Sequence, residues 1–269
     1  KGYKLPDKIN ILFVGDIIGE PGFNFLKLVL PSIKTKYNID FTIANAENIS
    51  NGIGLLERDA KSILALDVDV LTGGNHTFDK IQTHKYINDS DTVLRPLNYP
   101  KGVYGKGYGV YKVKDKDVSI CVSNLQGRVY MKPIEDPFRT FDWMYEKVKE
   151  QTNIILVDFH AEVTAEKIAF GWYADGRASA ILGTHTHIQT ADSRVLPGGT
   201  AYITDVGMTG PYDSVIGMKK EVSIRRFLYA TPQKHETASD DLRLAACVVQ
   251  IDTKTGKALS ITRIMYPEF

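Results

Sequence analysis

Two histidines separated by one residue stand just after an apolar run in this chain. The run has the sequence ASAIL at residues 178–182, and the histidines, His185 and His187, lie in the segment GTHTH at residues 183–187. In an extended segment, side chains two residues apart point to the same side. Both imidazoles would therefore face one point at the end of a buried strand, which suits a metal site. A purely structural role for the pair is the alternative.

Other apolar runs end in the same way, on polar residues that can bind a metal ion. From their apolar content and flanking turn residues, we expect strands at 9–14, 41–44, 68–72 and 153–157. The residues that follow these strands are Asp16, Glu47 with Asn48, Asn75 with His76, and His160. A mixed set of carboxylate, amide and imidazole ligands suits Mn²⁺, Fe²⁺ or Zn²⁺. The set is larger than one tetrahedral ion needs and is sufficient for two, as in the clamp used for phosphoryl-ester hydrolysis.

Each of these residues also has an ordinary structural interpretation. Asp16 could cap a helix, and Glu47 could be a solvated loop acid. Asn75 could supply a left-handed turn beside Gly74, and His160 could be a core histidine with satisfied hydrogen bonds. Taken together, however, these residues recur at the carboxyl ends of strands, where ligands bind in open α/β sheets. We therefore expect one shared site.

The remaining elements alternate in the way that positions such loops. Apolar spacing predicts helices at 23–37, 55–66, 80–87, 137–151 and 164–175, and strands at 108–113, 118–122, 178–182, 200–204, 244–252 and 259–266. Gly19, Pro21 and Gly22 indicate a loop before the first helix, and residues 205–211 are expected to form a glycine-rich loop at the rim of the site. We find no repeat or linker, so residues 1–269 are expected to form one domain with two mixed sheets flanked by helices.

Composition limits the classes of partner. The chain has 269 residues and a formal net charge of +1, which gives no sign of a nucleic-acid or membrane surface on the scale of the whole protein. No apolar stretch reaches the roughly 18 residues of a membrane span, and residues 1–7 lack the apolar region of a signal peptide. Cys121 and Cys247 lie in apolar, strand-like runs, which predicts buried free thiols in a reducing compartment. We therefore expect a cytoplasmic protein.

The motifs and their order resemble those of the calcineurin-like metallophosphoesterases, and closely those of the YmdB-type branch of bacterial phosphodiesterases. The segments that carry the resemblance are VGDIIGEPG at 14–22, NAEN at 45–48, GGNHTFD at 73–79, GTHTH at 183–187 and TDVGMTGP at 204–211. They extend over most of the chain. The resemblance implies a four-layer α/β/β/α sandwich with two mixed sheets and a di-metal centre.

The resemblance also assigns ligands, in two sets that share one carboxylate. One ion would be bound by Asp16, Glu47, Asn48 and His187, and the other by Glu47, Asn75, His160 and His185, with Glu47 bridging. The broad superfamily has a histidine two residues after the first aspartate, where this chain has Ile18, and its bridging acid is an aspartate rather than a glutamate. Asn48 would take the place of the missing histidine. The ions would be iron or manganese in preference to zinc.

The implied reaction is hydrolysis of a phosphodiester, and the resembled family is associated with 2′,3′-cyclic nucleotides and a 2′-phosphodiesterase activity. A hydroxide bridging the two ions would attack phosphorus in line with the leaving oxygen. His76, the strand-end histidine outside both ligand sets, would protonate that oxygen as general acid. Asp79 would either orient His76 by a hydrogen bond or cap the helix expected from residue 80.

Other functions fit the same residues. The centre could serve a phosphomonoesterase or protein phosphatase, and the protein could be a regulator that binds a nucleotide without turnover. A metal-dependent amidohydrolase is disfavoured, because its H-x-H pair follows the first strand of a barrel. We expect a small phosphodiester or cyclic nucleotide, including RNA-derived ones, as the partner, together with a homo-oligomeric state and no membrane. The locally basic segment 219–226 is expected to be a solvated helix face, although it could contact a phosphate or RNA.

Overall fold

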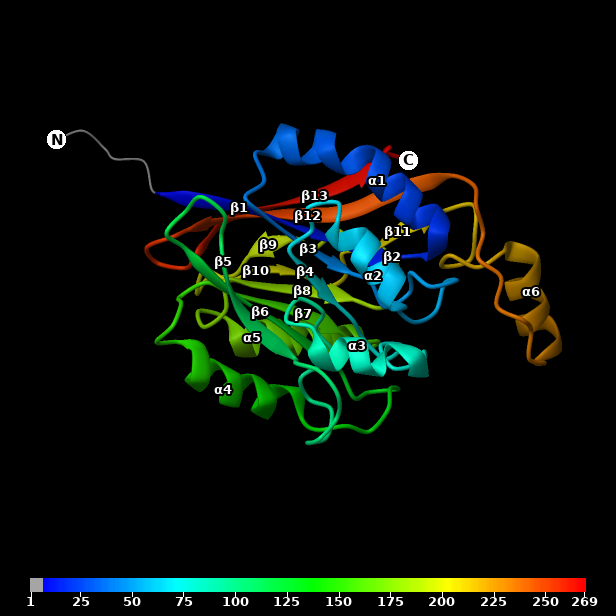
Figure 1. Ribbon diagram of the computed structural model, residues 1–269, viewed down its shortest axis with the longest axis horizontal. Coiled ribbons are helices and arrows are strands. Elements are labelled where there is room, and N and C mark those ends of the chain that lie inside the picture. Colours follow the sequence, from blue (N-terminus) through cyan, green and yellow to red (C-terminus); the bar gives the residue numbers. More distant parts are fainter. Residues whose placement is uncertain (1–6) are drawn as a thin grey trace.

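The computed structural model describes residues 7–269 and arranges them in four layers (Figure 1). Two β-sheets pack face to face in the middle. Helices α1 (Gly19–Tyr37) and α2 (Glu57–Leu64) cover the outer face of the first sheet, and α4 (Pro137–Val148) and α5 (Thr164–Ala174) cover the outer face of the second. This is the α/β/β/α sandwich that the family resemblance implies, and its two mixed sheets flanked by helices are those that the sequence pattern predicts.

In the first sheet, parallel and antiparallel strands are combined around β1 (Lys8–Val14). The strand order is β2-β11-β12-β1-β3-β4, and β13 (Ala258–Tyr266) pairs with β12. The other members are β2 (Asp16–Ile17), β3 (Phe41–Asn45), β4 (Val70–Thr72), β11 (Met208–Pro211) and β12 (Leu242–Asp252). Because β1, β3 and β4 are parallel, their carboxyl ends meet at one edge.

The second sheet has a parallel centre between two antiparallel edge strands. Its order is β5-β6-β7-β8-β10-β9, with β6, β7, β8 and β10 parallel. The members are β5 (Tyr108–Lys112), β6 (Ser119–Gln126), β7 (Ile155–His160), β8 (Ala180–Thr184), β9 (Arg194–Val195) and β10 (Ala201–Ile203). The loops after β7 and β8 therefore leave this sheet at a shared edge.

The first sheet is buried on both faces along its central strand, β1. Ile11 and Phe13 point into the core between the sheets, while Leu12 and Val14 point into the core beneath α1 and α2. A strand buried on both faces must be apolar at nearly every position, which explains the continuous run at residues 9–14. The polar residue that follows, Asp16, therefore lies at the end of a rigid element.

Helix α1 begins at Gly19, four residues before the predicted start, so the prediction of a loop that includes Gly19, Pro21 and Gly22 is wrong. Proline is tolerated in the first helical turn because the N–H groups there have no partner within the helix. Gly22 is required by packing rather than by a turn. A Cβ at this position would lie 2.4 Å from the carbonyl oxygen of Thr209 on β11.

Two other segments differ from expectation. Residues 208–211 form strand β11, which pairs with β2 and β12, so only residues 205–207 remain as the expected loop. The helix expected at 80–87 is divided into a 3₁₀ helix, Ile81–Thr83, and α3, His84–Asp89. By contrast, the basic segment behaves as predicted. It lies in and just before α6 (Lys220–Tyr229), which projects away from the sheets in Figure 1, and its charged residues are exposed.

Cys121 and Cys247 are buried free thiols, as expected, and burial raises the pKa of Cys121 to about 12. Among residues 7–269, no helix combines the length and the apolar content needed to cross a membrane.

Candidate metal centre

Glu47 and His160 lie in contact where the carboxyl ends of the parallel strands of the two sheets are adjacent. Glu47 follows β3 of the first sheet, His160 ends β7 of the second, and both side chains are buried. Glu47 Oε1 lies 3.0 Å from His160 Nε2. Asn75 Oδ1 lies 2.9 Å and His185 Nδ1 3.1 Å from the same nitrogen. Residues from loops far apart in the sequence therefore place one carboxylate, one amide and two imidazoles around a single point.

A second group of side chains also adjoins Glu47. His187 Nε2 is 3.3 Å from Asn48 Nδ2 and 3.9 Å from Asp16 Oδ1. Asn48 Nδ2 is in turn 3.3 Å from Glu47 Oε1. His187 Nδ1 donates a hydrogen bond to the carbonyl oxygen of Ile216, at 2.9 Å, so the lone pair of Nε2 faces the group. Glu47 thus lies between the two predicted ligand sets.

The surroundings of Asp16 show whether these side chains could bind a cation. Its Oδ1 atom is buried and accepts no hydrogen bond from the residues described. A buried carboxylate oxygen without a donor is costly, and burial raises the pKa of Asp16 above its usual value although the charges of His187 and His160 oppose the shift. A metal ion between Asp16 and His187 would satisfy this oxygen, so the donor set fits a bound cation.

The other ligand set also stabilises positive charge. Burial alone would lower the pKa of His160, but the adjacent Glu47 carboxylate raises it to about 9. Burial raises the pKa of Glu47, yet His160 outweighs this and lowers it to about 2. Glu47 therefore remains a carboxylate at neutral pH. Burial and the charge of His160 lower the pKa of His185 to about 3, which keeps its imidazole neutral and able to bind a metal.

A buried network behind His160 orients its ring. Thr184 Oγ1 donates to Asp158 Oδ1 at 2.6 Å and lies 2.8 Å from His160 Nδ1. Because the hydroxyl has one proton, it accepts from Nδ1–H, and Nε2 is the nitrogen that faces Glu47. Asp158 also accepts from Asn45 Nδ2 at 2.9 Å, which ties the ends of the two sheets together.

His76 lies beside this cluster without joining it. Its backbone N–H donates to Glu47 Oε2 at 2.9 Å, while its imidazole Nδ1 lies 2.6 Å from Asp79 Oδ2. The side chain of His76 is 34% exposed, in contrast to the buried Glu47. Of the two roles expected for Asp79, the structure contains the hydrogen bond to His76. Lys80 and Thr83, rather than Asp79, precede the 3₁₀ helix and α3.

The sequence and the backbone fold identify the family. A family model described as YmdB-like protein matches residues 12–264. The chain belongs to the YmdB-like family. This YmdB-like chain is 47% identical over 257 residues to the 2′,3′-cyclic-nucleotide 2′-phosphodiesterase of Bacillus subtilis (strain 168), covering 96% of this chain and 97% of that protein. The resemblance inferred from the motifs is therefore confirmed.

Two crystal structures of similar proteins agree with the YmdB-like assignment. A hypothetical protein from Thermus thermophilus superimposes with a TM-score of 0.89 at 40% identity, covering 96% of this chain and 99% of that one. A novel phosphatase from Mycoplasma pneumoniae has a TM-score of 0.91 at 34% identity, covering 97% and 94%. Membership of this metallophosphoesterase-type family implies the use of divalent metal ions, for which the structure contains a candidate site.

Sequence reasoning missed several residues around the centre of this YmdB-like chain. Glu162 Oε2 lies 2.9 Å from His185 Nε2, so His185 presents Nδ1 to the cluster. Asp158 could have been found, because residues 158 and 160 share one face of β7. Lys167 and Asp205, which form a buried ion pair at 2.7 Å, could not be found from spacing, because they lie 38 residues apart in the sequence.

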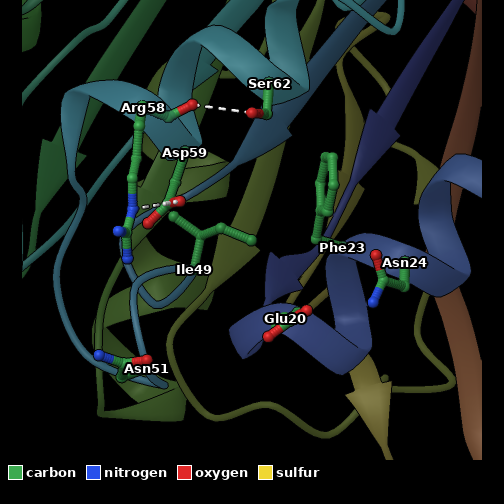
Figure 2. Close-up of a pocket in the computed structure, with 8 residues that line it drawn as sticks. All are labelled: Glu20, Phe23, Asn24, Ile49, Asn51, Arg58, Asp59 and Ser62. Carbon is green, nitrogen blue, oxygen red and sulfur yellow. Dashed lines mark hydrogen bonds and ion pairs between the residues drawn. The ribbon is translucent and has the colours of Figure 1, made fainter.

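A separate cavity of about 310 Å³ lies between the first turns of α1 and the start of α2. Figure 2 shows Glu20, Phe23 and Asn24 on one side and Arg58, Asp59 and Ser62 on the other, with Ile49 between the two groups and Asn51 at the lower left. None of the predicted ligands lines this cavity. In this YmdB-like chain the candidate metal centre is therefore marked by its convergent donor atoms rather than by this cavity.

Proposed function

We propose that this chain is a two-metal phosphodiesterase that hydrolyses 2′,3′-cyclic nucleotides at the bond from phosphorus to the 2′ oxygen. The observation that carries the proposal is the position of Glu47, whose buried carboxylate contacts both groups of side chains that could bind a metal ion, through His160 in one group and Asn48 in the other. The name of the 47% identical relative from Bacillus subtilis supports the substrate class. Small cyclic phosphates, including those derived from RNA, are the expected substrates.

In this proposal the two ions share Glu47. Asp16, Asn48 and His187 complete one site, and the distances of 3.3 Å and 3.9 Å from His187 Nε2 to the other two support this grouping. For Asn48 the amide oxygen would face the ion, which requires rotation of the amide about its terminal bond.

Asn75, His160 and His185 complete the other site. The ligand atoms of Glu47, His160 and His185 all lie within 4.8 Å of one another. The ions are iron or manganese in this proposal, because the carboxylate and amide oxygens of the two sets suit manganese and the imidazoles suit iron, and no cysteine of the kind common in zinc sites belongs to either set.

Two bound divalent ions would neutralise the phosphoryl oxygens and lower the pKa of a water molecule that attacks phosphorus. The buried carboxylates of Asp16 and Glu47 and the imidazoles of His160, His185 and His187 would hold those ions, and His160 would lose a proton when its ion binds. His76 donates a proton from Nε2 to the departing 2′ oxygen, because its Nδ1 is engaged by Asp79 Oδ2 at 2.6 Å. The product retains its phosphate on the 3′ oxygen.

A phosphomonoesterase is the second candidate, favoured by the description of the Mycoplasma pneumoniae structure as a novel phosphatase. Turnover of bis-p-nitrophenyl phosphate against p-nitrophenyl phosphate separates the two. We expect the diester to be preferred, and 2′,3′-cyclic AMP to yield the 3′-monophosphate. Strong preference for the monoester would overturn the proposal. A regulator without turnover predicts instead that a His76→Ala variant keeps its biological effect.

We also propose that the protein is a cytoplasmic homo-oligomer. The buried free thiols support a reducing compartment. Helix α6 exposes the adjacent side chains of Phe227 to 81% and Leu228 to 70%, and exposed apolar surface of this kind is typical of interaction sites, which supports association of copies. Light scattering of the purified protein tests the oligomeric state, and a monomer at all concentrations would contradict it.

A further inference from the structure

The backbone of the H-x-H segment adopts conformations that residues other than glycine rarely take. His185 has a φ of +101° and His187 a φ of +66°. Such a backbone persists only where the surrounding structure imposes it. Thr186, between the two histidines, donates both its backbone N–H, at 3.0 Å, and its hydroxyl, at 2.8 Å, to Asp205 Oδ2. The carboxylate of Asp205 therefore fixes the residue that separates the two proposed ligands.

Asp205 is itself held by a buried lysine. Lys167, on α5, donates from Nζ to Asp205 Oδ2 at 2.7 Å and to the carbonyl oxygen of Thr184 at 2.6 Å. Lys167 is 1% exposed and Asp205 is fully buried. The ammonium group of Lys167 thus hydrogen-bonds both Thr184, the last residue of β8, and Asp205, the carboxylate that accepts from Thr186. The segment 184–186 is held from both its start and its end.

The glycine of the GTHTH motif provides the space for this lysine. A Cβ on Gly183 would lie 2.9 Å from Lys167 Cε and 1.7 Å from the carbonyl oxygen of Thr204. A side chain at position 183 would therefore displace both Lys167 and the residue that follows β10. The ammonium group also balances the charge of Asp205, so the pair as a whole adds no net charge next to the cation site.

We propose that Lys167 and Asp205 are positioning residues that set the backbone of the H-x-H segment, so that His185 and His187 each reach a different metal ion. This inference rests on the proposed two-ion centre. The hydrogen bonds of the pair run to Thr184 and Thr186, so both residues act through the backbone of the segment. Removal of Lys167 and Asp205 is expected to weaken the binding of both ions, because each proposed ligand set contains one of the two histidines.

The test compares Mn²⁺ binding and thermal unfolding of metal-free protein. The double variant Lys167→Met/Asp205→Asn removes both charges together, which avoids leaving one of them buried and unpaired. Thr186→Val is milder, because it keeps the ion pair and removes a single hydroxyl donor. Calorimetric titration should give a 10- to 100-fold loss of affinity for both ions in the double variant, roughly the usual effect of removing an outer partner of a metal ligand. Thr186→Val should show a smaller loss in the same direction.

Asp175→Asn is the matched control. Asp175 also holds backbone, accepting from the N–H groups of Gly198 and Thr200 at 2.8 Å and 3.3 Å, but before the strands rather than after them. The Asp175→Asn variant should unfold at a lower temperature than the wild type and bind Mn²⁺ with unchanged affinity. The inference is overturned if the double variant and Thr186→Val unfold at lower temperature while binding both ions as wild type does. If the wild type itself fails to bind two ions, the proposed function fails first.

Discussion

Replacement of His76 by alanine separates acid catalysis from metal binding. The imidazole of His76 is about a third exposed, and the contact with Glu47 is made by the backbone N–H, which alanine keeps. We therefore expect His76→Ala to fold and to bind Mn²⁺ as the wild type does. Loss of a general acid lowers the rate by about 10²–10⁴-fold, which corresponds to about 2.7–5.4 kcal/mol of activation free energy.

Two substrates with different leaving groups test whether His76 protonates the leaving oxygen. The 2′ oxygen of 2′,3′-cyclic AMP departs as a basic alkoxide and needs a proton, whereas p-nitrophenolate does not. The kcat of His76→Ala should fall by about 10²–10⁴-fold on the cyclic nucleotide and by less than about tenfold on bis-p-nitrophenyl phosphate. His84→Ala is the control, because His84 hydrogen-bonds the carbonyl of Phe78 outside the cluster. Equal losses on both substrates, or loss of metal from His76→Ala, would refute the assignment.

Three further predictions follow from the same geometry. Asp79→Asn removes the carboxylate that fixes His76 Nδ1 and should lower kcat on the cyclic nucleotide by roughly 10- to 100-fold with metal content unchanged, as measured by steady-state kinetics and metal analysis. Glu47→Gln should abolish binding of both ions, whereas Asn75→Ala should weaken the binding of one ion only. Titration with Mn²⁺ measures both affinities, and equal effects of the two variants would contradict the bridging role of Glu47. In metal-free protein, the lowered pKa of Glu47, about 2, contributes stability that is present above its unfolded value near 4.5 and lost as pH falls toward 2. The raised pKa of His160, about 9, contributes stability present below 6.5 and lost as pH rises through 9. The stability that this pair adds, measured as the difference in unfolding temperature between wild type and Glu47→Gln, should therefore be highest between about pH 4.5 and 6.5, and a difference that does not vary with pH would contradict the pair.

The sequence predicts which polar side chains come together at the edge of the sheets, because strands place the residues that follow them by a simple rule. Asp16, Glu47 and His160 each follow an apolar run, and the carboxyl ends of parallel strands meet at one edge. Their encounter across two sheets depends on how the sheets face each other, which the family resemblance supplied and the spacing did not. Residue types at strand ends therefore indicated the chemistry before the fold was known.

Elements that depend on distant contacts were predicted less well. The early start of α1 rests on the close approach of Gly22 to Thr209, and β11 exists because β2 and β12 supply its hydrogen bonds. Glycine and proline in both segments read locally as loop. Lys167 illustrates the same limit for function: a lysine in an amphipathic helix reads as solvated, yet its Nζ lies buried against Asp205.

The central claim is that Glu47 bridges two metal ions. A crystal structure of the protein loaded with Mn²⁺, with anomalous scattering recorded for the metal, tests it most directly. We predict two anomalous peaks roughly 3.5–4 Å apart, with Glu47 bound to both, His187 bound to one and His185 bound to the other. A single peak, or two peaks that do not share Glu47, would contradict the claim.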